Sequence, residues 1–211
     1  MDKGCVKRAV TLAVCRYAAA QGEYYVPAAA SARHVHLSQA DVAALFGEGY
    51  ELRQFRPLTQ PGQFAAEEKV DIVGPRGTIS GVRVLGPARK ETQVEISITD
   101  AIRLGIKPVV RMSGDIAFTP GVKLVGPKGS VDLPQGVIVA ARHLHMSPEE
   151  AAAYGLKDGD VVSLRKPGPR EVIFGNVVVR SGKGHSLEVH LDTDEANAAM
   201  LSNGDLLEII K

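Results

Sequence analysis

The sequence contains one eight-residue pattern twice, and this duplication constrains the fold more than any other feature. The pattern reads small, small, Arg, His, apolar, His, apolar, Ser, and it occurs at residues 31–38 and 140–147. In both copies an acidic residue follows three positions after the Ser, and an alanine-rich run comes next. A repeat of this kind favours two related domains of about 100 residues each, and a domain of that size can bury a core.

Each copy predicts a strand that leads into a helix capped by the Ser. Residues i and i+2 of a strand point to the same face, so His34 and His36 project together, as do His143 and His145. Two imidazoles on one strand make half of a zinc site, and zinc takes three protein ligands in catalytic sites and four in structural ones. The alternative is that these histidines are polar residues at a strand end. Their repetition in matching contexts favours metal.

A third ligand for each pair can be proposed from strand faces. In residues 93–98 the apolar side chains alternate, which places Glu95 on the polar face together with Gln93. In residues 187–191 the same alternation places His190 on the polar face together with Glu188. We therefore propose Glu95 for one pair and His190 for the other, and the alternative for Glu95 is an ordinary solvent-facing carboxylate. His185 follows a glycine-rich turn and is interpreted as a surface residue.

The charge balance excludes several classes of function. The chain has 25 Lys and Arg residues against 24 Asp and Glu residues, so no global charge marks it for nucleic acid or an anionic membrane. No apolar run approaches the ~20 residues that a membrane span needs. The two cysteines, Cys5 and Cys15, are interpreted as free thiols in a reducing compartment. An anionic ligand must then be bound by a local cluster, for which the guanidinium of Arg89 is suited.

Residues 2–20 are expected to form an amphipathic helix. Val6, Val10, Val14 and Tyr17 recur at helical spacing, with Ala13 beside them. We reject a signal peptide because Arg16 interrupts an apolar stretch that is already short. Two interpretations remain open: the helix packs on its own protein, or it is a detachable segment that docks a partner.

The rest of the chain alternates in the manner of short strands. Twenty-two glycines and 12 prolines, with turns such as Gly74–Gly77, separate these strands. Short helices are expected near residues 39–46, 99–105, 148–154 and 193–200, the last capped by Thr193 or Asp194. We therefore predict a mainly β fold with short α-helices, consisting of two small β-barrel domains capped by helices and related by internal duplication.

Three segments together resemble the PduL-type phosphate propanoyltransferases, over nearly the whole chain from about residue 24. They are the two Arg-His-x-His blocks, the Gly-Pro-x-Arg-x-x-Thr-Gln-Val-Glu segment at 86–95, and His-Leu-Asp-Thr-Asp-Glu-Ala-Asn at 190–197. The resemblance implies two zinc ions in a cleft between two β-barrel domains. One departure is Ala32, where the family usually has Asn.

Carried over by position, the resemblance implies roles for particular residues. One zinc would be held by His34, His36 and Glu95, and the other by His143, His145 and His190. Arg89 looks like the family's phosphate-binding arginine. Positions that approach coenzyme A in the family are matched by Ser31, Arg83 and Asn197.

The implied organisation has four segments. Residues 1–22 form the N-terminal helix, and residues 23–46 carry the first strand, which joins the C-terminal barrel, and the first His pair. Residues 47–134 form a central β-barrel and residues 135–211 a C-terminal one. The resemblance also implies a homodimer in the lumen of a bacterial microcompartment or in the cytoplasm. The N-terminal helix is then a candidate for docking to shell or cargo proteins.

The implied reaction is reversible, direct transfer of a propanoyl or similar short acyl group from coenzyme A to phosphate. Two alternatives stay open on the residues themselves. One is a zinc-dependent hydrolase of thioesters or phosphoesters, in which water replaces phosphate. The other is a non-catalytic metal-binding module with closed sites.

Overall fold

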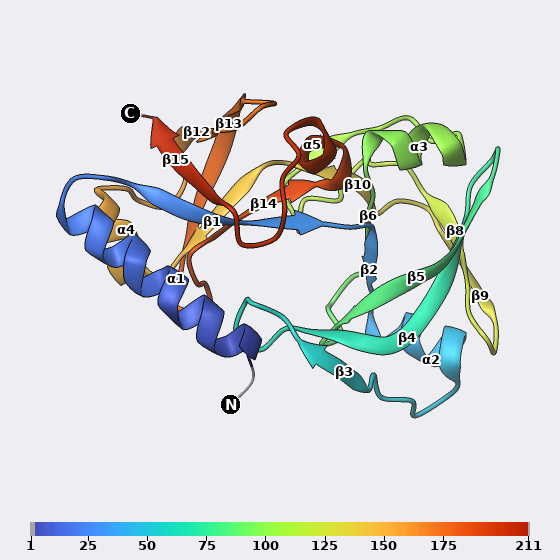
Figure 1. Ribbon diagram of the computed structural model, residues 1–211. Coiled ribbons are helices and arrows are strands. Elements are labelled where there is room, and N and C mark those ends of the chain that lie inside the picture. The colour runs from blue at the N-terminus through green and yellow to red at the C-terminus, as the bar shows by residue number, and fades with distance from the viewer. Residues whose placement is uncertain (1–2, 211) are drawn as a thin grey trace. The chain divides into compact units, whose positions relative to one another are not determined.

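The computed structural model describes residues 3–210, with side chains from Val6 onward, so Cys5 and Asp2 lie outside the described side chains. The described chain is mainly β with five helices, as the sequence predicted (Figure 1). It divides into two compact units. Unit 1 combines the chain up to Ser31 with the chain from Arg142 onward, and unit 2 is Ala32–Ala141.

Unit 1 contains a closed six-stranded barrel. Its strands follow one another in the order β1-β14-β11-β13-β12-β15. The first strand pairs in parallel with β14 and antiparallel with β15, so a segment from the start of the chain closes a barrel built from its end (Figure 1). The strands are β1 Tyr25–Ser31, β11 His143–Met146, β12 Val161–Lys166, β13 Val172–Ser181, β14 Glu188–Asp192 and β15 Leu206–Ile210.

Three helices belong to unit 1: α1 (Lys3–Ala20), α4 (Pro148–Tyr154) and α5 (Thr193–Ala198). The face of α1 that packs on the barrel is not the one that carries Val6, Val10, Val14 and Tyr17. Cys15 and Ala19 enter the barrel's apolar core beside Tyr154, with Leu12 packed against it. The stripe Val6, Val10, Val14 and Tyr17 is 43–72% exposed. Small side chains at 15, 18 and 19 allow the helix to approach closely, and the bulkier valines are left outside.

Unit 2 is built on one curled sheet with the order β7-β10-β6-β2-β5-β4-β8-β9, and β3 pairs with β4. The helices α2 (Gln39–Phe46) and α3 (Ile98–Leu104) belong to it. Its apolar core gathers side chains such as Val35, Leu45 and Leu124. The strands are β2 His34–His36, β3 Gln54–Pro57, β4 Phe64–Val73, β5 Thr78–Gly86, β6 Gln93–Glu95, β7 Val110–Arg111, β8 Val122–Val125, β9 Ser130–Leu133 and β10 Val137–Ala140.

The sequence repeat corresponds to a repeated local topology. In unit 2, β2 lies between β5, which runs parallel to it, and β6, which runs antiparallel. In unit 1, β11 lies in the same way between parallel β13 and antiparallel β14. Each His-x-His strand is therefore a central strand, and its side chains are held by neighbours on both sides.

The arginine of each repeat also has a repeated role. Arg33 forms an ion pair with Asp100, and Arg142 forms one with Glu195. Both acids occupy the third position of the helix that follows the antiparallel partner strand, where they complete a capping box. The cap of α5 is Asp192 rather than the expected Thr193 or Asp194, because the helix begins one residue earlier. Each arginine thus ties its His strand to a neighbouring helix start.

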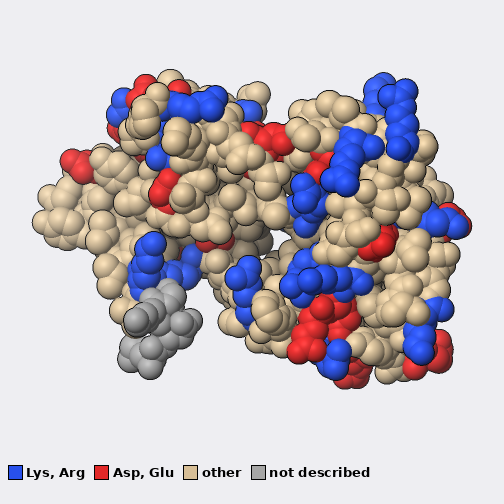
Figure 2. All heavy atoms as spheres, turned by 45° about the vertical axis from the view of Figure 1, so that its right-hand side comes forward, with Lys and Arg blue, Asp and Glu red and all other residues tan. Residues whose placement is uncertain are grey.

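The described surface mixes both signs of charge. On the face shown in Figure 2, Lys and Arg side chains lie among Asp and Glu side chains on each unit. Among residues 3–210, no helix combines the length and the apolar character needed to cross a bilayer.

Candidate metal centres

The first candidate centre, called the His34 site, consists of His34, His36 and Glu95 in unit 2. In the β2–β6 pair, Glu95 lies opposite His34 and Gln93 lies opposite His36. The Nε2 atoms of His34 and His36 are 3.5 and 3.6 Å from the two oxygens of Glu95. The ligand atoms of all three side chains lie within 4.8 Å of one another, and all three residues are buried. Strand register alone brings this cluster together.

Hydrogen bonding fixes the tautomer of His34. Its Nδ1 lies 2.8 Å from the carbonyl oxygen of Ala32. A carbonyl only accepts, so Nδ1 carries the proton and the lone pair of Nε2 is directed at the cluster. The contact uses the backbone of Ala32, so it does not depend on the Asn side chain usual in the resembling family.

Charge and burial act against each other in the His34 site. Burial alone would raise the pKa of Glu95, but the two histidines hold it well below the usual range. Burial opposes a charged His34, and the Glu95 carboxylate outweighs it, so the pKa of His34 is raised. Burial lowers the pKa of His36 to about 4. Glu95 is therefore ionised and His36 neutral, and these are the protonation states in which a carboxylate and an imidazole bind a divalent cation.

Three further side chains support Glu95. The amide of Gln93 donates to Oε1 of Glu95 at 2.6 Å, and Ser113 Oγ lies 3.1 Å from the same oxygen. Arg89 Nη1 donates to Ser113 Oγ at 3.3 Å. The backbone N–H of Arg89 donates to the carbonyl of Leu37, the residue that follows β2. The predicted phosphate-binding arginine is therefore anchored beside the His34 site.

The second candidate centre, called the His143 site, consists of His143, His145 and His190 in unit 1. His190 lies opposite His143 in the β11–β14 pair, which is the position that Glu95 has relative to His34. The three ring centroids are 4.8–5.0 Å apart, and the ligand atoms lie within 4.8 Å of one another. The structure thus brings the predicted third residue to each His pair, and its role as a metal ligand stays a prediction.

The ring of His145 is prepared to act as a ligand. Burial, followed by the neighbouring imidazoles, lowers the pKa of His145 to about 2. Its Nδ1 is buried and has no hydrogen-bond partner among the described residues. A neutral buried imidazole with a free nitrogen, next to two more imidazoles, fits a divalent metal of the zinc type. His185, interpreted as a surface residue, instead stacks on His145 at 4.4 Å between centroids.

A polar residue two positions before the third ligand supports it in both units. In unit 2 this residue is Gln93, which donates to Glu95. In unit 1 it is Glu188, whose Oε2 lies 2.9 Å from Nε2 of His190. A carboxylate accepts only, so Nε2 of His190 carries the proton and Nδ1 keeps its lone pair for a metal. The repeat thus extends from the ligands to the side chains behind them.

Of the residues assigned to coenzyme A, Arg83 lies beside the His34 site, opposite His34 in the β2–β5 pair. In unit 2, Arg83 donates to the carbonyl oxygens of Ala66 and Glu67 and stacks on Phe55. In unit 1, Ser31 ends β1 opposite Asp192, and Asn197 is exposed on α5. Their roles stay predictions.

Sequence reasoning missed the supports of both clusters. Gln93 and Glu188 were placed on the polar faces of their strands without a role, and the alternation around them was the available signal. Ser113 and Arg8 carried no signal, because they are brought to the sites by tertiary folding from 18 and 180 residues away.

The fold and the two clusters define a β-rich protein with a candidate metal-binding group in each of its two related units. A profile of the family described as phosphate propanoyltransferase matches residues 27–202. A phosphate propanoyltransferase of Thermotoga maritima is 57% identical over 182 residues, covering 86% of this chain and 87% of the relative. One from Priestia megaterium is 54% identical over 180 residues, covering 85% and 83%. The chain belongs to the phosphate propanoyltransferase family, and it is an acyltransferase.

Proposed function

We propose that the chain transfers a propanoyl or similar short acyl group between coenzyme A and phosphate, with two zinc ions as cofactors. The observation that carries the proposal is the pair of three-residue clusters, each built on a repeated strand whose two histidines are buried. Three protein ligands leave a position for substrate, which is the pattern of catalytic zinc. Bound zinc would supply Lewis acidity toward a phosphate or carbonyl oxygen.

Arg89 is the group we propose for phosphate. Its planar guanidinium suits the bidentate geometry of a phosphoryl group, and its link through Ser113 to Glu95 keeps it beside the His34 site. Phosphate held in this way directs one oxygen at the thioester carbonyl. The new C–O bond forms as the C–S bond breaks, and the thiolate of coenzyme A leaves with the electron pair.

We favour direct transfer over an acyl-enzyme. Among the described cysteines, Cys15 is fully buried and its pKa is raised to about 11, chiefly by burial. A thiol in that state is a poor nucleophile. We propose that Ser31, Arg83 and Asn197 contact coenzyme A.

One experiment separates this proposal from its alternatives. Thiol release from propanoyl-CoA is measured with and without phosphate, and with and without chelator. A phosphate acyltransferase releases thiol only when phosphate is present, and forms acyl phosphate in equal amount. A zinc hydrolase releases thiol without phosphate, and a binding module releases none. Full activity in metal-free protein would contradict the role of zinc.

We also propose a partner for α1, namely a microcompartment shell or cargo protein, and a homodimeric state. The exposed stripe of Val6, Val10, Val14 and Tyr17 supports the first. Co-sedimentation with shell proteins, compared between the parent and Val10→Asp, tests it. Equal co-sedimentation would count against the stripe, and light scattering would report the oligomeric state.

A further inference from the structure

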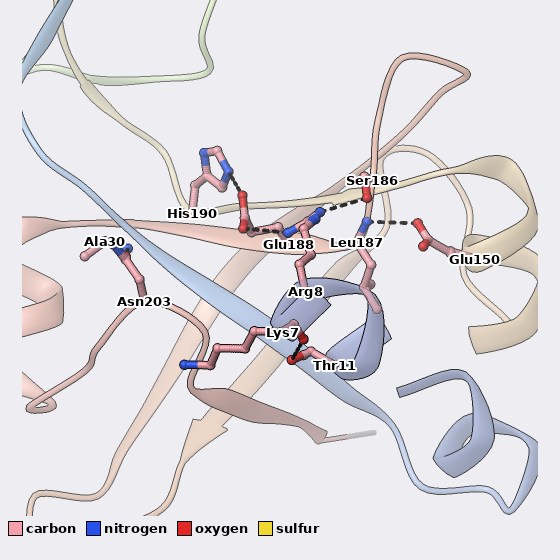
Figure 3. Close-up of polar contacts among 10 residues, drawn as sticks. All are labelled: Lys7, Arg8, Thr11, Ala30, Glu150, Ser186, Leu187, Glu188, His190 and Asn203. Atoms are coloured by element: carbon pink, nitrogen blue, oxygen red, sulfur yellow. Dashed lines mark hydrogen bonds and ion pairs between the residues drawn. The ribbon is translucent and has the colours of Figure 1, made fainter. Parts of the chain in front are cut away.

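A chain of polar contacts runs from the N-terminal helix to the His143 site (Figure 3). Arg8 Nη1 donates to Oε1 of Glu188 at 3.1 Å, and the other oxygen of Glu188 lies 2.9 Å from Nε2 of His190. Arg8 Nη2 donates to Ser186 Oγ at 2.8 Å. All four residues belong to unit 1. The first turns of α1 are therefore two contacts away from a candidate metal ligand.

Glu188 needs a cationic partner to stay where it is. The residue is only 6% exposed, and a buried carboxylate is costly unless it is paired and hydrogen-bonded. Arg8 engages one oxygen and His190 the other. The guanidinium is itself held in place by its second contact, to Ser186, and a planar fork of this kind restricts the rotation of what it binds.

The position of α1 along the barrel is set by contacts independent of Arg8. Cys15 and Ala19 pack in the barrel core, and Arg16 lies 3.6 Å from Glu150 at the start of α4. Arg8 is two helical turns before Arg16. Packing of the second half of α1 thus places Arg8 beside Glu188.

We propose that Arg8 is a positioning residue for the His143 site, acting through Glu188 to hold the ring of His190. The inference rests on the proposed metal dependence. It assigns the N-terminal helix to the support of a metal centre, beyond any role as a docking segment. In unit 2 the corresponding support comes from Gln93 on β6 and from Ser113 in the turn after β7, whereas in unit 1 it comes from the opposite end of the chain.

The test measures metal affinity at this site alone. The parent is the full chain with His34→Ala and His36→Ala, so that only the His143 site remains. Binding of Co²⁺ and Zn²⁺ is measured by competition with a chelator, and the Co²⁺ absorption bands report ligand geometry. Loss of a side chain behind a metal ligand costs about 10–100-fold in affinity, and we expect Arg8→Ala to lie near tenfold, with altered bands.

Arg16→Ala is the matched control, because it removes an arginine of the same helix that contacts Glu150 and not the site. We expect it to keep the parent's affinity while weakening helix docking to a similar extent, which thermal unfolding measures. In a Glu188→Ala background, Arg8→Ala should cause no further loss, because its effect passes through Glu188.

The outcomes are distinct. Unchanged affinity in Arg8→Ala, an equal loss in Arg16→Ala, or a full further loss in the Glu188→Ala background would each overturn the inference. A parent that takes up no metal at all would instead contradict the proposed metal dependence, and the inference with it.

Discussion

Glu95 lies directly opposite His34 across the β2–β6 pair, with one carboxylate oxygen 3.5 Å from Nε2 of the imidazole. His190 occupies the same position opposite His143 in the other unit. The same strand pairing therefore places the third candidate ligand in both clusters, a carboxylate in one and an imidazole in the other. The difference in ligand type gives the His34 site one negative charge more than the His143 site.

We expect Glu95→Gln to remove metal from the His34 site and to abolish acyl transfer. The amide has nearly the same shape but lacks the charge that an ionised carboxylate brings to a divalent cation. Metal content should fall from about two ions per chain to about one. Glu91→Gln, at an exposed position four residues earlier, is the control and should keep both ions. Retention of two tightly bound ions in Glu95→Gln would contradict the ligand assignment.

Gln93→Leu should weaken the His34 site without removing it. The substitution deletes the 2.6 Å hydrogen bond to Glu95 and leaves that carboxylate less firmly oriented. Affinity for zinc, measured by chelator competition, should fall about 10–100-fold. Gln54→Leu, at an exposed position on β3, should leave affinity as it was. An equal affinity for both variants would show that Gln93 has no role in positioning.

Arg89→Lys is expected to raise the KM for phosphate and to lower kcat, because a point charge replaces a planar fork. Loss of one donor to developing charge costs about 100–1,000-fold in kcat, and we expect Arg89→Ala to fall in this range with Arg89→Lys between it and the parent. Lys90→Ala changes the adjacent exposed cation and should be neutral. An equal loss of kcat in Lys90→Ala would show that Arg89 acts only through the local positive charge and not through a specific contact with phosphate.

The metal-free protein should lose stability as the pH falls below about 6.5. The pKa of His145 is lowered to about 2 and that of His36 to about 4, from an ordinary value of 6.5, so both stay neutral in the fold. The unfolded chain takes up these protons and the folded one does not, so the free energy of unfolding decreases by about 1.4 kcal/mol per pH unit for each. His34 acts in the opposite direction, because its pKa is raised. Its contribution to the free energy of unfolding is fully present below pH 6.5 and is lost as the pH rises.

Urea unfolding in chelator at pH 5.5, 6.5 and 7.5 tests this dependence. In His145→Gln the loss of unfolding free energy between pH 6.5 and 5.5 should be smaller by about 1 kcal/mol, because one of the two suppressed imidazoles is gone and an ordinary imidazole is already half-protonated at pH 6.5. The same slope in the parent and in His145→Gln would show that His145 takes up its proton in the folded chain.

Cys15 reports whether α1 stays packed on the barrel. Its thiol is buried and its pKa is raised to about 11, so in a Cys5→Ser protein we expect slow modification by a thiol reagent at pH 8. A detachable helix would expose Cys15 and let it react at the rate of a free thiol. Measuring the rate with and without urea gives the internal control. Rapid reaction of the native protein would favour the detachable segment over an integral helix.

The sequence by itself determined the candidate ligands, because their grouping follows from strand periodicity. Alternation in a strand places every second residue on one face, so His34 with His36, and Glu95 with Gln93, could be grouped without coordinates. Capping residues and turn glycines also have local causes, which is why the mainly β class and helices such as Pro148–Tyr154 were predictable. The end of α5 and the cap at Asp192 were not, since helix termini depend on contacts outside the pattern.

Only the tertiary structure decided which residues stand behind the ligands. Ser113 reaches Glu95 from a loop, and Arg8 reaches Glu188 across 180 positions, and no local pattern encodes a contact of that kind. The orientation of α1 on the barrel was likewise decided only by the tertiary structure. Its valine stripe indicated an amphipathic helix without deciding which face packs, and the buried side chains are Cys15, Ala18 and Ala19, because the barrel surface admits small side chains at close approach. Sequence periodicity reports which residues share a face of one helix or strand. Which face is buried depends also on the shape of the element that it packs against.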